Sequence, residues 1–400
     1  MTRFLVQASS VSWSGAPDLC MNPVDGRPAV HWTVKKIFDQ FSNARVTIVA
    51  PEFDRGGKME ELRTQFSSRD LDILYAHDES PLRRMIRATA ELSPAELFVR
   101  VDGLHLWFDV PSVEKMLSAA RQQALDCVKF PDDYPPQFAS EVYRVSAVRR
   151  LLDLLGNLPE PEANRYHVHP KFLLMRLPEF KTRYLEDVPA YDPDYLLDCR
   201  RCSGEAFEPR TAVKASRIAS GDQYSFHYEF AREYLGPSDS VLDIACGHGY
   251  GSALVAPRVA RVTGADIDEH TVIENQKRYA TIRNLEFTQQ DATRLTFQDT
   301  SFDCVLSMET IEHVQDDVQY CREISRVLKP GGRLILSTPQ SSCGRIPLNP
   351  AHIREYSLKD LRDLLGRHFS VEKVVGLKAG TVHFDGDPYG NNMLIVCRKS

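Results

Sequence analysis

The chain has 400 residues, which is too many for one ordinary hydrophobic core, so two domains of about 200 residues each are expected. Apolar residues make up 42% and charged residues 26%, as in a soluble globular protein. The net charge of −6 disfavours nucleic acid and anionic membrane surfaces as partners. No apolar run approaches the roughly 18 residues of a membrane span. The nine thinly spread cysteines predict reduced thiols and a cytoplasmic location.

The first half of the chain alternates expected strands and helices. Apolar runs predict strands at 3–8, 45–51, 71–76 and 96–103, and amphipathic patterns predict helices at 27–41 and 80–92. Pro28 suits a first helical turn, and Ser80 with Pro81 opens the second helix. Strands that are separated by helices predict a mostly parallel sheet. Between about 156 and 215, proline and polar residues predict connecting structure.

Regular alternation then restarts and predicts a second domain. The expected helices are 224–235, 250–256, 270–280 and 315–328, and the expected strands are 240–245, 261–266, 284–288, 302–307 and 332–337. We therefore expect one domain over 1–205, with a linker over 181–215, and another over 216–400. The expected fold class is α/β, with two domains that each have a mostly parallel sheet and helices on both faces.

The stretch "VLDIACGHGYGS" (241–252) places a glycine turn at the end of the second domain's first strand. Gly247, Gly249 and Gly251 allow positive φ and a close approach of the backbone to a ligand. The dinucleotide-binding pattern G-x-G-x-x-G fails here, because its third glycine would fall at Ser252.

Three carboxylates accompany this turn. Asp243 lies inside the first strand, Asp266 ends the second strand and Asp291 ends the third. A carboxylate after the second strand can accept both hydroxyls of a ribose, and one after the third can accept from an adenine amine. This pattern predicts a site for an adenosine that has no pyrophosphate. A nucleotide-free domain with ordinary turn glycines is the alternative.

Four segments resemble the class I S-adenosylmethionine-dependent methyltransferases: "VLDIACGHGYGS", "GADID", "QQDATRLTFQDTSFDCVLSMETIEHV" and "VLKPGGRLILSTP". The resemblance covers about 215–400 and implies a Rossmann-like sheet of seven strands. It implies that the glycine loop holds the methionine part of the cofactor, that Asp266 binds the ribose, and that Asp291 and Ala292 lie at the adenine. The further cofactor contacts that it implies are Asp243, Ala245, Ile267, Met308 and Tyr224.

Methyl transfer is a displacement at a sulfonium, so the protein has to align the acceptor and, for a hydroxyl, remove its proton. Candidates follow the fourth strand in "SMETIEHV", where His313 suits a general base and Glu312 lies beside it. Related sugar O-methyltransferases often have a histidine in this segment. The alternative is that both residues only pack against or cap the next helix, with Asp316 and Asp317 in its first turn.

Two further stretches resemble methyltransferases of surface-polysaccharide gene sets. "NPAHIREYSLKDL" (349–361) implies that His352, Arg354 and Glu355 project over the acceptor side of the site, where arginine offers a planar fork for a carboxylate or phosphate. Glu309 is also expected to bind the acceptor. Pairing of Arg354 with Glu355 is the alternative. "DQYSFHYEFAREYL" (222–235) implies a lid helix with Tyr224 and His227 near the cofactor, or else an amphipathic helix packed on the sheet.

Residues 1–180 resemble, more faintly, the cytidylyltransferase-like proteins of bacterial surface-sugar pathways, including the spore-coat polysaccharide type. The matching segments are "FLVQA", "VDGRPAVHWTVKKI", "VRVDG", "FASEVYRVSAVRRL" and "NRYHVHPKF". This implies a nucleotidyltransferase (GT-A-like) fold. The loop "SSVSWSGAPDLCMNP" has no basic residue for a triphosphate, and Ala139 stands where the family has a metal-binding aspartate. Asp102 and Glu141 remain and could hold magnesium.

We therefore expect a cytoplasmic enzyme with S-adenosylmethionine as cofactor and no assigned metal ligands, since Cys199 and Cys202 form only one close pair. The expected acceptor is a hydroxyl of a sugar or nucleotide-activated sugar in surface glycan assembly. The first domain is expected to be degenerate, with nucleotide-sugar binding, shaping of the acceptor site or homodimer formation as its open roles. The alternatives are a bifunctional CMP-sugar synthetase and methyltransferase, a non-catalytic binding protein, or an enzyme that methylates a small metabolite or a quinone-like ring.

Overall fold

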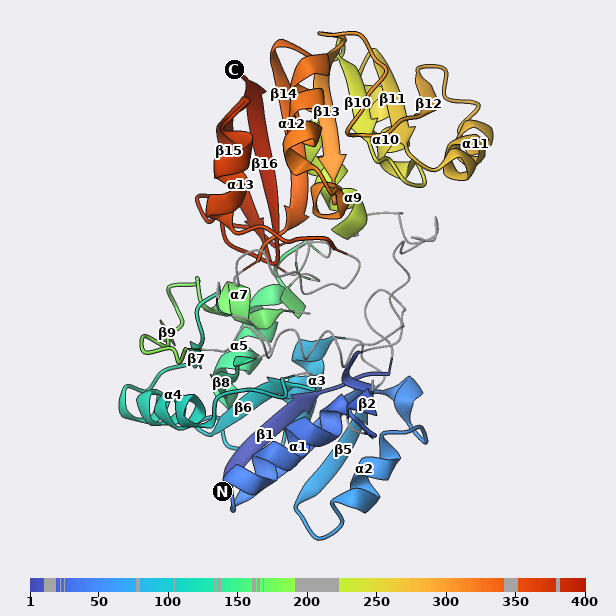
Figure 1. Ribbon diagram of the computed structural model, residues 1–400. Coiled ribbons are helices and arrows are strands. Elements are labelled where there is room, and N and C mark those ends of the chain that lie inside the picture. Colours follow the sequence, from blue (N-terminus) through green and yellow to red (C-terminus); the bar gives the residue numbers. More distant parts are fainter. Residues whose placement is uncertain are drawn as a thin grey trace. The chain divides into compact units, whose positions relative to one another are not determined.

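The computed structural model describes residues 1–10, 19–21, 23–24, 26–76, 80–103, 105–132, 134, 138–159, 163, 166–167, 169–190, 223–341, 352–378 and 382–400, without the side chains of residues 19, 223 and 224. The chain divides into two compact units, Met1–Ala206 and Phe207–Ser400. Each unit contains one large sheet, and both are drawn in Figure 1. No helix among the described residues has both the length and the hydrophobicity to cross a bilayer.

The sheet of the first unit has seven strands in the order β5-β4-β1-β6-β8-β7-β9. Their bounds are β1 Thr2–Gln7, β4 Ala44–Pro51, β5 Leu71–Ala76, β6 Leu97–Asp102, β7 Cys127–Lys129, β8 Glu141–Arg144 and β9 Thr182–Tyr184. The first four are parallel, as the sequence predicts, whereas β8 is antiparallel to both β6 and β7. A short hairpin of β2 (Pro23–Val24) and β3 (Arg27–Pro28) precedes the first helix.

The helices of the first unit are α1 Ala29–Gln40, α2 Glu60–Gln65, α3 Pro81–Ala88, α4 Val110–Gln122, α5 Val145–Leu155 and α7 Pro170–Leu174, with short 3₁₀ turns η1 Leu19–Met21 and η2 Glu52–Asp54. Ser80 caps α3 by accepting a hydrogen bond from the amide of Arg83, which confirms the predicted start of that helix. Pro28 lies just outside α1, because it pairs with Pro23 in the hairpin.

The sheet of the second unit also has seven strands, in the order β12-β11-β10-β13-β14-β16-β15. Their bounds are β10 Ser240–Ile244, β11 Arg261–Asp266, β12 Leu285–Gln289, β13 Phe302–Met308, β14 Leu328–Pro339, β15 Phe369–Leu377 and β16 Asn392–Lys399. All neighbours are parallel except β16, which is antiparallel to β14 and β15. The chain progresses outward in both directions from β10, so the topological switch point lies between β10 and β13.

The helices of the second unit are α9 Gln223–Arg232, α10 Tyr250–Val255, α11 Glu269–Arg278, α12 Asp317–Val327 and α13 Leu358–Leu365, with 3₁₀ turns η5 Ala256–Arg258 and η6 Ile311–His313. Side-chain caps fix three of these helix starts. The side chain of the capping residue accepts a hydrogen bond from a backbone amide of the first turn in each case. The pairs are Asp268 with Thr271 in α11, Asp316 with Gln319 in α12, and Ser357 with Asp360 in α13. The helices and strands that the sequence predicts in this half are confirmed to within a few residues at each end.

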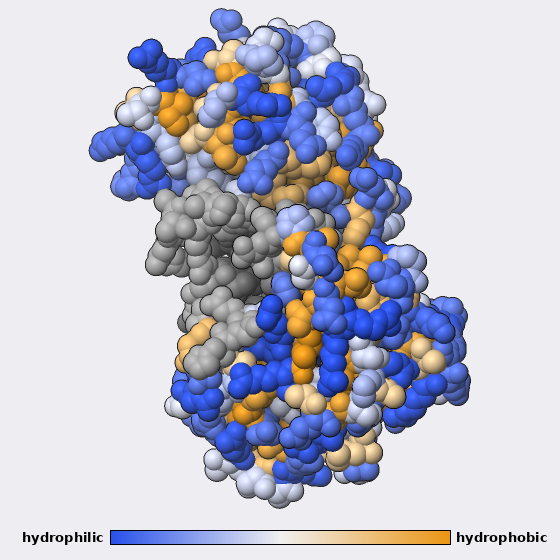
Figure 2. Space-filling view, turned by 180° about the vertical axis from the view of Figure 1, so that it is seen from behind, coloured by the Kyte–Doolittle hydropathy of each residue, from blue (hydrophilic) through white to orange (hydrophobic). Residues whose placement is uncertain are grey.

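Two hydrophobic clusters cover opposite faces of this sheet. Alternate residues of β10 show the division, because Leu242 packs with α12 and α13, whereas Val241 packs with α9 and α10. Figure 1 shows the strands of this sheet and the helices that pack on it. On the face of the molecule drawn in Figure 2, hydrophilic and hydrophobic residues are interspersed over both units. The six described cysteines are buried free thiols, at positions 20, 127, 246, 304, 321 and 397.

Candidate active site

The candidate site lies at the carboxyl ends of β10, β11 and β13, next to the switch point of the second sheet. The glycine turn follows β10, and η6 follows β13, the strand paired with β10. A hydrogen bond from Thr310 Oγ1 to the carbonyl oxygen of Ile244 (3.4 Å) joins the two segments. Ligands of open α/β sheets bind at this edge, so both segments face the expected location of a ligand.

The glycine turn is held in a conformation that exposes its backbone. Ala245, Gly247 and Gly249 have positive φ values of 55°, 50° and 71°. The amide of Cys246 donates to the carbonyl of Ala265 on β11 (2.9 Å), which fixes the turn against the neighbouring strand. A side chain at Gly247 would meet nothing within 4 Å, so that face of the turn is open. A non-glycine residue such as Ala245 with positive φ is strained and marks a position under constraint.

Asp266 and Ile267 follow the turn at the end of β11. Asp266 is 6% exposed, and its two carboxylate oxygens accept from the amides of Gly247 and Asp268, each at 3.0 Å. The Ile267 side chain is 59% exposed, which is unusual for a large apolar residue beside a buried strand end. An exposed apolar side chain next to a held carboxylate suits a ligand that has a flat ring and hydroxyls.

Asp291 and Ala292 follow β12 on the same edge. Asp291 is exposed, and its Oδ1 accepts from the amide of Thr293 (2.8 Å) and from Thr293 Oγ1 (2.7 Å). Ala292 is partly buried against the large core cluster. These contacts fix the Asp291 carboxylate at the edge of the sheet where the sequence predicts that an adenine binds.

Asp243 differs from these residues because it is fully buried. Its Oδ2 accepts from Ser252 Oγ (2.5 Å) and its Oδ1 from the hydroxyl of Tyr228 (3.2 Å). Burial, together with the negative charge of Asp266, raises the pKa of Asp243 to about 7, against the opposing effect of the two hydrogen bonds. In this structure Asp243 joins β10 to α9 and α10, beneath the glycine turn.

Glu309 follows β13 and is the second strained residue of the site, with a φ of 49°. Its Oε1 accepts from Ser337 Oγ (2.7 Å), and its Oε2 accepts from Asn392 Nδ2 (2.6 Å). Ser337 Oγ also lies 3.1 Å from Nδ1 of His227, and burial lowers the pKa of that histidine. The preceding Met308 is buried in the core cluster that packs α9 and α10 on the sheet.

Glu312 is completely buried in η6. Its Oε2 accepts from Thr338 Oγ1 (2.9 Å), whereas its Oε1 is buried and has no hydrogen-bond partner among the described residues. Burial, followed by the negative charge of Glu309 and further that of Glu355, raises the pKa of Glu312 well above its ordinary value. The capping of α12 belongs to Asp316, so Glu312 and His313 do not cap that helix.

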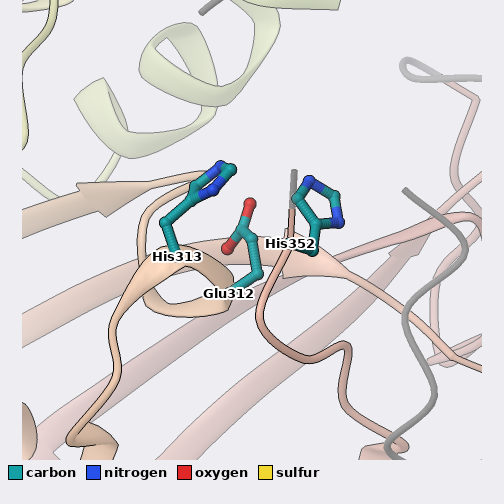
Figure 3. Close-up of side chains that lie close together, drawn as sticks. All are labelled: Glu312, His313 and His352. Carbon is teal, nitrogen blue, oxygen red and sulfur yellow. The ribbon is translucent and has the colours of Figure 1, made fainter. Parts of the chain in front are cut away.

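His313 and His352 lie on either side of the Glu312 carboxylate, as Figure 3 shows. Their ring centroids are 4.9 Å apart in an edge-to-face arrangement. His313 is exposed, and His352 is partly buried with Nδ1 2.7 Å from Oε1 of Glu355. One nitrogen or oxygen from each of Glu312, His313 and His352 lies within 4.8 Å of the others, a separation suited to a metal ion. The sequence alone predicts no metal ligands among these residues.

Arg354 docks the segment after His352 onto α12. Its guanidinium forms an ion pair with Asp317 and donates to the carbonyl of Gln315 (2.7 Å). Tyr356 OH donates to the same Asp317 carboxylate (2.9 Å). Instead of pairing with Glu355, which the sequence left open, Arg354 pairs with a residue 37 positions earlier. Its immediate role in this structure is to hold His352 near η6.

Four residues of the site were not found from the sequence: Thr310, Ser337, Thr338 and Asn392. Ser337 and Thr338 end an otherwise apolar strand, "LILSTP", and polar residues at that point are a usable indication of a site. Asn392 gives no such indication, because β16 reaches the site only through its antiparallel pairing with β14. Tyr224, whose side chain is not described, and Cys199 and Cys202 lie outside the described parts.

In the first unit, Glu141 on β8 is buried between two cations. Its Oε2 accepts from Arg100 Nη1 (3.1 Å) and from Tyr143 OH (2.7 Å), and its Oε1 accepts from Lys171 Nζ (2.6 Å). Although burial opposes it, the charges of Lys171 and Arg100 hold the pKa of Glu141 well below its ordinary value. Asp102 ends the neighbouring strand and is more exposed. Most of the loop after β1, residues 11–18, lies outside the described residues.

Comparisons with known proteins find similarity between the second unit and methyltransferases. Residues 242–336 match the family model described as a methyltransferase domain. A protein of Mycolicibacterium smegmatis named as a probable S-adenosylmethionine-dependent methyltransferase is 39% identical over 145 residues, which cover 35% of this chain and 55% of that protein. A Mycobacterium tuberculosis protein with a similar name is 38% identical over 129 residues, covering 31% of this chain and 46% of that protein. The chain thus spans about half the length of these curated relatives.

Among solved structures, an S-adenosylmethionine-dependent methyltransferase from Mesorhizobium loti has a TM-score of 0.38 and 15% identity, over 44% of this chain and all of that chain. The match to the family model places a methyltransferase domain in the second unit, and the curated relatives that match this part of the chain are named as probable S-adenosylmethionine-dependent methyltransferases. S-adenosylmethionine is the cofactor of this class of domain.

Proposed function

We propose that the protein transfers the methyl group of S-adenosylmethionine to a hydroxyl of a sugar or nucleotide-activated sugar. One observation carries the proposal. The hydrogen bond between Thr310 and Ile244 joins η6, which contains Glu312 and His313, to the end of β10. The glycine turn starts there, and its Gly247 amide donates to Asp266. The groups that we propose to bind the sulfonium nucleoside and the proton-accepting groups therefore lie at the same edge of the sheet. The sugar class rests on the resemblance of residues 349–361 and of the first unit to proteins of surface-glycan pathways.

The residues of the glycine turn and of β11 fit this cofactor. The open backbone at Gly247 leaves room for its amino-acid part, Asp266 accepts from ribose hydroxyls, and the exposed Ile267 packs on the adenine. Asp291 and Ala292 lie at the other side of the ring. The cofactor supplies a methyl group on a positively charged sulfur, which is already a good leaving group.

For catalysis, the protein has to orient the acceptor hydroxyl and remove its proton. His313 is exposed at the site and carries a ring nitrogen suited to accept a proton. Glu312 lies directly beneath it in the same turn, and His352 and Glu309 border the acceptor side. We assign these groups to the acceptor and the groups of β10 and β11 to the cofactor.

The first unit, in this proposal, has no nucleotidyl-transfer activity. Glu141, one of the two carboxylates left for a magnesium ion, is neutralised by Arg100 and Lys171. The loop after β1 carries no basic residue that would compensate a triphosphate. The proposed role of this unit is instead to recognise a nucleotide-linked sugar.

The test uses the full-length protein with isotopically labelled methyl donor and a panel of sugars and nucleotide-activated sugars. We expect label in at least one acceptor, and loss of most transfer in His313→Ala but not in the matched variant His270→Ala on the exposed face of α11. Binding of the demethylated cofactor without transfer to any acceptor would favour the non-catalytic alternative. Release of pyrophosphate from CTP with magnesium and a sugar acid would show instead that the first unit is active.

A further inference from the structure

The three residues that surround the Glu312 carboxylate come from two separate segments. Glu312 and His313 belong to η6, and His352 lies about 40 residues later. Their ligand atoms all lie within 4.8 Å of one another, and Figure 3 shows the carboxylate between the two rings. A tetrahedral metal ion about 2.1 Å from each atom requires ligand atoms that are about 3.4 Å apart, so the three side chains would rotate toward one another when an ion binds.

A second observation points to a cation at the same place. Oε1 of Glu312 is buried and has no hydrogen-bond partner in the described part of the chain, although Oε2 accepts from Thr338. A buried carboxylate oxygen without a partner is costly, and native structures rarely keep one without a reason. A metal ion at the center of the three side chains would provide the missing interaction.

The surroundings of His352 fit a metal ligand. The carboxylate of Glu355, which is 3% exposed, accepts a hydrogen bond from Nδ1 at 2.7 Å, so Nε2 is the ring nitrogen with the lone pair. Histidines that bind metals usually donate their other ring nitrogen to a carboxylate in this way. The amide of Ile353 donates to the backbone carbonyl of Glu312 (2.8 Å), which holds the two segments together.

We infer that Glu312, His313 and His352 form a binding site for a divalent transition-metal ion such as Zn²⁺. Two imidazoles and one carboxylate are a ligand set that such ions prefer, and three protein ligands leave a coordination position open. The role of the ion rests on the proposed function. With an ion bound, the acceptor hydroxyl would occupy the open position, where the ion would lower the pKa of that hydroxyl so that its proton passes to solvent. The oxygen would then form a bond to the methyl carbon while the bond from that carbon to the sulfonium sulfur breaks. In the presence of the ion, His313 would serve as a ligand, and solvent would take over the role of proton acceptor that the proposed function gives to His313 in the absence of a metal.

The test titrates Co²⁺, whose visible absorption reports its ligands, into full-length protein that has been freed of metal with a chelator. We expect one bound ion per chain in the wild type. The dissociation constant should rise at least tenfold in Glu312→Gln and in His352→Ala, and roughly ten- to a hundredfold in Glu355→Gln, which removes only the carboxylate behind His352. The matched variant His270→Ala should bind as the wild type does. Equal Co²⁺ affinity in the wild type and in His352→Ala would overturn the inference.

Calorimetry with the demethylated cofactor separates this inference from misfolding and from the proposed function. A variant that binds the cofactor normally but has lost Co²⁺ is folded, and it supports the metal site. If the chelated wild type transferred methyl groups at the full rate while His313→Ala did not, the general-base role would stand and the metal site would fail. If Co²⁺ bound with the expected dependence on these variants but no sugar accepted a methyl group, the metal site would stand and the sugar assignment would fail.

Discussion

The hydroxyl of Tyr228 on α9 donates a hydrogen bond to Oδ1 of Asp243 on β10, at 3.2 Å, and both residues are buried. The same tyrosine ring covers Gly251 at the start of α10, where an added Cβ would lie 2.0 Å from the nearest ring atom. One side chain thus joins a helix that precedes the sheet to its first strand and to the glycine turn. The third glycine of the motif therefore leaves room for the Tyr228 ring, although its φ is not positive.

Replacing Gly251 by alanine should destabilise the second unit by about 1–3 kcal/mol, because the ring of Tyr228 cannot move without losing its bond to Asp243. In a Tyr228→Ala background the same replacement should cost much less, since the clash is gone. Urea unfolding followed by circular dichroism measures both values. Gly236→Ala is the matched control, because its Cβ would make only ordinary contacts. Equal costs in the two backgrounds would contradict the packing described here.

The raised pKa of Asp243, about 7, makes the stability of the second unit depend on pH. Since the folded state binds this proton more tightly than the unfolded state, the contribution is fully present below about pH 4 and is lost as the pH rises to about 7. The slope should reach at most about 1.4 kcal/mol per pH unit. Asp243→Asn should remove this slope, whereas the exposed Asp385→Asn should keep it. A wild-type unfolding free energy without this component would show that Asp243 is not held protonated.

Asp266→Asn should weaken binding of the demethylated cofactor by about ten- to a hundredfold, because an amide keeps only one acceptor oxygen for the ribose and for the amides of Gly247 and Asp268. Isothermal titration calorimetry measures this constant directly. The control is Asp299→Asn, on an exposed aspartate that pairs with Arg326 outside the site. Unchanged affinity in Asp266→Asn would contradict the prediction that the ribose of the cofactor binds to this carboxylate.

In the first unit, Glu141 should produce the opposite dependence on pH. Its folded-state pKa lies well below the ordinary value, so its contribution is present above about pH 4.5 and is lost as the pH falls. All three tryptophans lie in this unit, so tryptophan fluorescence measures the unfolding of the first unit without a contribution from the second. Glu141→Gln should cost about 3–5 kcal/mol at pH 7, because it leaves Arg100 and Lys171 without their carboxylate. Glu114→Gln, on the exposed side of α4, should have little effect.

Much of the second unit could be predicted from local patterns. The strand that ends at Asp266, the helix that starts after Asp268 and the turn around Gly247 follow from apolar periodicity, a capping residue and glycines. In the first unit, the antiparallel strand β8 was not predicted, because a run of four residues can pair in either direction. The direction depends on partners that are far away in sequence.

The sequence by itself determined the strands and helices from α9 to β14, the glycine turn and the methyltransferase motif, because these depend on residues within a few positions of one another. Only the tertiary structure decided that Asp243 is buried against Tyr228, that Arg354 pairs with Asp317, and that His352 meets Glu312 and His313. Such contacts join segments that the sheet order brings together. Their hydrogen bonds and charges follow from strand pairing and burial, which no local pattern of residues specifies.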